Sequence, residues 1–70
     1  MLEVTVIFDP NANRVGGVVK LNRPSSARLD PRNAIAARNV AAGVRANAWV
    51  TDGTKTYRVV GNRARLVKER

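Results

Sequence analysis

A chain of seventy residues forms one domain at most, with a thin core, because a domain this small buries only about 60% of its unfolded surface. The absence of cysteine and histidine excludes disulfides, thiolate zinc sites and the common nucleophile–base pairs of enzymes. Thirteen lysines and arginines against five acids give a net charge of +8, which favours a polyanionic partner. The same charge also fits a merely solvated surface in an arginine-rich protein.

The first apolar segment does not have the features of a signal peptide. Leu2–Phe8 is too short, contains Glu3 and lacks a basic start. No other apolar run approaches the ~18 residues of a membrane span. We therefore expect a cytoplasmic protein, or one assembled into a particle from the cytoplasm.

The N-terminal part, residues 2–22, predicts a β-hairpin. Apolar and polar residues alternate along Leu2–Phe8, as in a strand with one buried face, and Asp9-Pro10 ends that strand. After a turn-rich stretch, Val18–Asn22 predicts a second strand antiparallel to the first.

A helix is predicted over residues 30–43. Asp30 is the expected N-cap, Pro31 suits the first helical position, and Gly43 suits the C-cap. At ~100° per residue, the helix has a small-residue side for the sheet and a basic outer side. The predicted buried side holds Asn33, Ala36, Ala37, Val40, Ala41 and Val44, and the outer side holds Ile35, Arg38, Ala42 and Arg45.

The last part, residues 46–68, predicts a three-stranded meander. Asp52-Gly53 suits a two-residue type I′ turn, and Gly61-Asn62 suits a type II′ turn. The strands that these turns separate are Ala46–Thr51, Thr54–Val60 and Arg63–Lys68.

Counting back from these turns predicts the pairing and gives the meander two unlike faces. Trp49 is expected opposite Thr56, and Arg58 opposite Arg65. The predicted core face holds Ala46, Ala48, Val50, Tyr57, Val59, Ala64 and Leu66, with Lys55 and Lys68 at its rim. The other face is polar and cationic, and holds Asn47, Trp49, Thr51, Thr54, Thr56, Arg58, Arg63, Arg65 and Val67.

Together these elements predict a single α+β domain, residues 1–70, in the order β-β-α-β-β-β. The hairpin and the meander should pack on one short helix, and they could also close into a barrel. An open edge, after Lys68 or at Leu2–Phe8, could pair with a strand of a partner.

Nothing in the sequence points to catalysis, a metal or a cofactor. Asp30 and Asp52 already serve as cap and turn residues, and Asp9 precedes a proline. No pair of carboxylates is spaced to act as acid and base or to hold magnesium, so we expect a protein that is not an enzyme.

The candidate site is the cationic face of the meander. An aromatic flanked by guanidinium groups on a sheet is one way in which proteins hold single-stranded nucleic acid, because bases stack and phosphates pair. We therefore expect a nucleic-acid-binding accessory protein that binds mainly through phosphate electrostatics. The candidate binding residues are Trp49, Arg58, Arg63 and Arg65, with Arg38, Arg45 and Arg14 assisting.

A second hypothesis uses the same face differently. Tryptophan and arginine are also enriched at protein–protein hot spots, so Trp49 could pack against another layer or another subunit. The chain would then be a structural module that forms a homo-oligomer or docks on an acidic protein surface, as in a virion or phage particle.

Overall fold

The computed structural model describes residues 1–8, 16–24 and 27–70, and it confirms the predicted order of elements. Arg14 and most of the predicted turn-rich stretch lie outside the described residues. The elements are β1 (Leu2–Phe8), β2 (Val18–Leu21), α1 (Pro31–Ala42), β3 (Ala48–Thr51), β4 (Lys55–Val60) and β5 (Arg63–Glu69).

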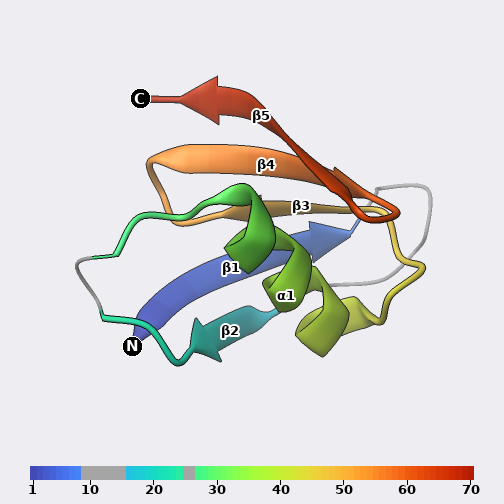
Figure 1. Cartoon of the computed structure of the whole chain (residues 1–70), viewed down its shortest axis with the longest axis horizontal. Helices are drawn as coiled ribbons and strands as arrows, with labels where there is room; N and C mark the ends of the chain where they lie inside the picture. The colour runs from blue at the N-terminus through green and yellow to red at the C-terminus, as the bar shows by residue number, and fades with distance from the viewer. Residues whose placement is uncertain (9–15, 25–26) are drawn as a thin grey trace.

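The strands form one open antiparallel sheet in the order β2-β1-β3-β4-β5 (Figure 1). β1 pairs with β2 on one side and with β3 on the other, so the hairpin and the meander are continuous. β1 is therefore an interior strand of the sheet and not the open edge that it was expected to offer. The edges are β2 and β5, and closure into a barrel does not occur.

The core lies between α1 and one face of the sheet. α1 crosses that face and contacts all five strands (Figure 1). Small residues on the helix allow a close approach, and branched residues on the strands fill the space beneath it. The buried cluster consists of Leu2, Val4, Val6, Val19, Leu29, Ala34, Ala37, Ala48, Val50, Tyr57 and Val59.

The described part of the chain contains no helix of the length and apolarity that a membrane crossing requires.

The ends of α1 are those that the sequence predicts. The carboxylate of Asp30 accepts a hydrogen bond of 2.7 Å from the backbone N–H of Asn33, and Pro31 occupies the first turn. At the other end Gly43 has a φ of 88° and donates its N–H to the carbonyl of Asn39. A left-handed residue of this kind favours glycine and ends the helix.

The predicted orientation of α1 about its own axis is right for Asn33 and Ala37, which are buried, but the buried side is rotated toward Ala34 and Arg38. Arg38, expected on the basic outer side, is fully buried, whereas Val40, expected against the sheet, is 71% exposed. The Arg38 guanidinium donates from Nε to Asn39 Oδ1 and from Nη1 to the carbonyl of Ala46. Arg38 therefore ties the helix to the segment that enters β3, and an alanine-rich helix offers too little apolar contrast to oppose this rotation.

The second turn of the meander has the predicted pairing, but the first turn falls one residue late. Arg58 lies opposite Arg65, as a two-residue turn at Gly61-Asn62 requires. Trp49 lies opposite Arg58 and not opposite Thr56. A turn displaced by one residue shifts the pairing of β3 with β4 by two residues, so the side chains of both strands keep their predicted faces.

The hydrogen bonds of Asp52 account for the displaced turn. Its carboxylate accepts the backbone N–H groups of Thr54 and Lys55, each at 2.8 Å. Its own N–H donates to the carbonyl of Lys55 at 3.2 Å. Asp52 is thereby held opposite Lys55, and Gly53 and Thr54 become the turn residues. Gly53 has a φ of 93°, a conformation that glycine adopts without strain.

Asp52 also connects this turn to the segment before the helix. The N–H of the buried Leu29 donates to its second carboxylate oxygen at 3.3 Å. Partial burial raises the pKa of Asp52, but hydrogen bonds from the backbone N–H groups of Lys55, Thr54, Leu29 and Asp52 itself lower it more. The pKa of Asp52 therefore lies below its usual value of 3.8.

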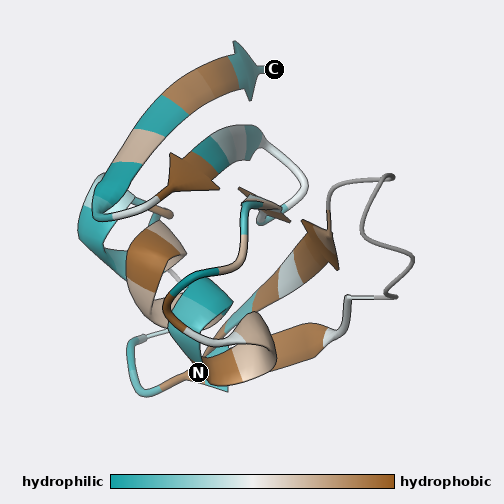
Figure 2. Ribbon diagram, turned by 90° about the vertical axis from the view of Figure 1, so that its right-hand side faces the viewer, coloured by the Kyte–Doolittle hydropathy of each residue, from teal (hydrophilic) through white to brown (hydrophobic). Residues whose placement is uncertain are grey.

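β5 departs from the prediction beyond its middle. Leu66 lies opposite Tyr57 but Lys68 lies opposite Thr56, so one extra residue forms a β-bulge. The bulge moves Lys68 from the rim of the core face to the outer face. Leu66, predicted in the core, is 44% exposed because β5 is the edge strand and extends beyond the helix (Figure 1). Hydrophilic and apolar residues alternate along its first half (Figure 2).

The buried guanidinium of Arg38 leads to a stability prediction. Within the described part of the chain, Nη2 has no hydrogen-bond partner and no carboxylate pairs with the group. We expect Arg38→Met, which keeps the aliphatic volume and removes a buried charge, to be at least as stable as the wild type. Arg38→Ala should lose about 2–4 kcal/mol of the free energy of unfolding, because it leaves a cavity. Urea unfolding followed by circular dichroism measures both, and equal losses would contradict the prediction.

The lowered pKa of Asp52 predicts a loss of stability in acid. A depressed folded-state pKa contributes stability that is present above pH 3.8 and is lost as the pH falls through the folded value. We expect Asp52→Asn to be less stable than the wild type at pH 7 and the difference to shrink below about pH 4. Unfolding in urea at a series of pH values tests this. A difference that stays constant down to pH 2 would contradict it.

Candidate nucleic-acid interface

The outer face of the sheet, opposite α1, carries a row of side chains in direct cross-strand register. Ile7 lies opposite Trp49, Trp49 opposite Arg58, and Arg58 opposite Arg65. The row therefore crosses β1, β3, β4 and β5 at right angles to the strands. We call Ile7, Trp49, Arg58 and Arg65 the cross-strand row.

The apolar half of the row is accessible. Trp49 is 42% exposed and Ile7 is 48% exposed. No other helix or strand of the described chain lies over this face, because α1 covers the opposite one (Figure 1). Single exposed apolar residues are common on protein surfaces, but tryptophan is enriched at interfaces, where its ring is covered and its N–H finds a partner.

Arg58 joins the apolar and cationic halves of the row. Its guanidinium carbon lies 5.5 Å from the centroid of the Trp49 ring, within the range of a cation–π contact. The shifted turn causes this contact, because the predicted register would have placed threonine beside the ring. Half-buried Arg58 and exposed Trp49 thus form one mixed surface of aromatic and guanidinium groups.

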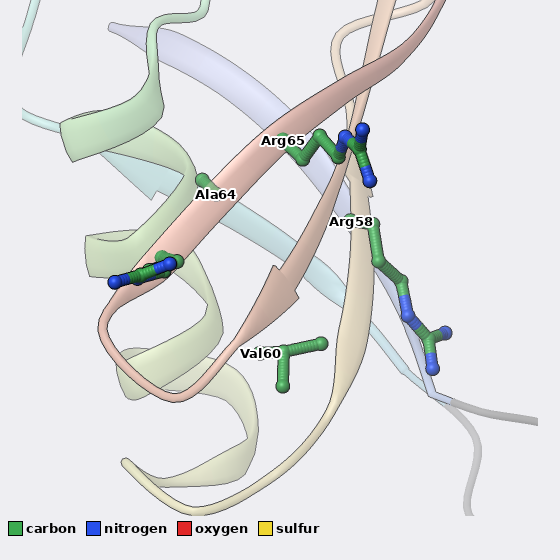
Figure 3. Close-up of a pocket in the computed structure, with 5 residues that line it drawn as sticks. Arg58, Val60, Ala64 and Arg65 are labelled. Carbon is green, nitrogen blue, oxygen red and sulfur yellow. The ribbon is translucent and has the colours of Figure 1, made fainter.

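The cationic half of the row borders a shallow hollow of about 630 Å³. Arg58 and Arg65 point away from α1, whereas Ala64 lies on the side of the helix (Figure 3). Three guanidinium groups and two small apolar residues surround the hollow: Arg58, Arg63, Arg65, Val60 and Ala64. Arg58 and Arg65 lie opposite each other, and like charges in that position destabilise a sheet slightly.

The remaining charges on the outer face are also mainly positive. Lys68 lies on this face because of the bulge, and Lys20 lies on it opposite Glu3. Among the described strand residues, Glu3 is the one acid whose side chain lies on this face. The positive potential is therefore strongest over β4 and β5, away from the Lys20–Glu3 pair.

The other predicted site residues do not join the row. Arg38 is buried between α1 and the start of β3, so it is not part of a binding surface. Arg45 is exposed in the turn between α1 and β3, outside the sheet. Arg14 lies outside the described residues. The structure thus brings together Trp49, Arg58, Arg63 and Arg65 from the predicted set.

The sequence did not predict that Ile7 and the hollow belong to this surface. Ile7 is the one apolar residue on the polar side of β1, which was a signal, but its place beside Trp49 depends on the pairing of β1 with β3. Val60 and Ala64 line the hollow from two adjacent strands, and no local pattern indicates such a depression.

The described residues offer no group of three or more acidic, histidine or cysteine side chains that could hold a metal ion. Comparison with known proteins finds no matching protein-family model, no similar curated protein and no similar solved structure.

Proposed function

We propose that this protein binds nucleic acid without catalysing a reaction, using the outer face of its sheet. The phosphates pair with the arginines of β4 and β5, and a base stacks on Trp49. Electrostatic attraction supplies most of the affinity, since the chain carries a net charge of +8.

The cross-strand row is the observation that supports this proposal. It sets an exposed indole directly beside the guanidinium group of Arg58, with Arg65 on the next strand, on a face with no second layer in the described chain. Base–aromatic stacking contributes about 1–3 kcal/mol per base and does not require a particular base. Phosphate pairing by arginine adds affinity without sequence information. Binding should therefore depend weakly on sequence.

The fold also favours single strands over duplexes. α1 is short and packs against the sheet, so no polar helix stands out to enter a major groove. A flat sheet face with one indole can stack on an unpaired base, whereas the bases of a duplex are stacked on each other.

Binding of a labelled single-stranded oligonucleotide, followed by anisotropy over a salt series, tests the proposal. We expect log affinity to fall linearly with log salt concentration, and the Trp49 fluorescence to be quenched in the complex. Trp49→Leu keeps apolar cover on the sheet and should weaken binding by about 1–3 kcal/mol with little change in the salt slope. Arg65→Gln should instead reduce the magnitude of the slope by about 0.7, because one phosphate contact is lost.

Arg32→Gln is the matched control, because it removes one exposed arginine from α1 instead of from the outer face. It should change the affinity less than Arg65→Gln does. The absence of binding at about 0.1 M salt, where a contact driven by charge should survive, would refute the proposal.

A second candidate function, assembly through β5, has one specific observation in its favour. β5 is an open edge, and exposed apolar residues lie near its middle at Leu66 and Val67. Self-pairing of β5 would bring the arginines of two copies together, and their repulsion opposes the pairing. We therefore expect light scattering at about 0.1 M salt to give the mass of one chain. A larger mass that Leu66→Lys reduces to that of one chain would favour the assembly function.

A further inference from the structure

We infer that a single strand crosses the β-strands along the cross-strand row and that the face holds about three or four nucleotides. This inference rests on the proposed function and adds the path, the footprint and the order of contacts. It applies to unpaired DNA and RNA alike, since the groups involved recognise base faces and phosphates.

The length of the row sets the footprint. Ile7 and Arg65 are separated by three strand spacings, and neighbouring strands lie about 4.8 Å apart, so the row is about 14 Å long. A stacked nucleic-acid strand advances about 3.4 Å per nucleotide, so about four nucleotides cover the row. An extended strand would cover it with fewer.

The distribution of charge selects the direction. A strand that followed β3 would pass from Trp49 to Thr51, and one that followed β4 from Arg58 would meet Thr56 on one side and Val60 on the other. These residues are neutral. At the far side of the sheet Lys20 is opposed by Glu3. A path from Trp49 across β4 to β5 meets Arg58 and then Arg65, and Arg63 lies two residues from Arg65 on the same face of β5.

The order of contacts along this path follows from the row and the hollow. One base stacks on Trp49, with Ile7 extending the apolar platform on the β1 side. The adjacent phosphate lies between Arg58 and Arg65, which are directly opposite each other on the neighbouring strands β4 and β5. The next nucleotide enters the hollow beside Val60 (Figure 3). There Arg63 pairs with its phosphate, and Val60 contacts its sugar.

Unlabelled oligothymidylates of two to eight nucleotides, titrated against Trp49 fluorescence at low salt, test the footprint. We expect the association constant to rise at least about tenfold from dT2 to dT4 as contacts are added. From dT4 to dT8 it should rise no more than about fivefold, which is the number of four-nucleotide frames that dT8 offers. A steady tenfold rise beyond dT4 would overturn the footprint.

Single-charge variants test the path, with dT4 as the probe. Arg65→Gln and Arg63→Gln should each weaken binding about three- to tenfold, because each removes a phosphate contact on the path. Lys20→Gln removes a charge from the same face but off the path, and Arg32→Gln removes one from the helix; both should weaken binding less than about twofold. Circular dichroism checks that each variant is folded.

The outcomes separate this inference from the proposed function. Equal losses for all four variants would overturn the path and leave nucleic-acid binding intact, whereas no binding of any oligonucleotide would refute both. Oligouridylate of four residues should bind within about threefold of dT4, because the 2′-hydroxyl has no part in these contacts. A preference of more than about tenfold for either would contradict recognition by base faces and phosphates alone.

Discussion

One short helix has to cover a five-stranded sheet, and the rest of the structure depends on that constraint. α1 has twelve residues and is therefore about 18 Å long, close to the width of five strands at about 4.8 Å spacing. It can cover one face and no more. The chain concentrates its buried valines and alanines under the helix and presents threonine, arginine and lysine on the other face. The open face that carries the candidate site therefore follows from the single helix among the described elements, as well as from composition.

Local signals were enough to predict the elements and their order. The alternation in Leu2–Phe8, the Asp30-Pro31 start of α1 and the Gly61-Asn62 turn are short-range patterns whose physical reasons do not involve the rest of the chain. The displaced first turn of the meander is different. It depends on a carboxylate that also binds the N–H of Leu29, 23 residues away, and a contact of that kind is visible only once the elements have packed.

The orientation of α1 and the ends of the core could not be predicted for related reasons. In a helix made mostly of alanine, burial of any one side gains nearly the same apolar area, so specific contacts decide the rotation. Here Arg38 favours the observed rotation through its bond to the carbonyl of Ala46, outside the helix. Leu66 follows the correct alternation but lies on an edge strand beyond the helix, and alternation alone does not show where the cover ends.

The candidate site shows how a register error can leave the face right and the chemistry wrong. Trp49 was predicted on the cationic face, and it is there, but its neighbour is Arg58 and not Thr56. Arg58 places a guanidinium group over the ring, and Arg65 lies opposite Arg58 on the next strand. The repulsion between Arg58 and Arg65 is small beside the burial energy of the core, and the contact of Arg58 with the ring, of the order of 0.5–1 kcal/mol, offsets part of it. The face can therefore exist without a ligand. A ligand of this face would associate with a preformed surface, and its affinity would not be reduced by the free energy of folding a segment.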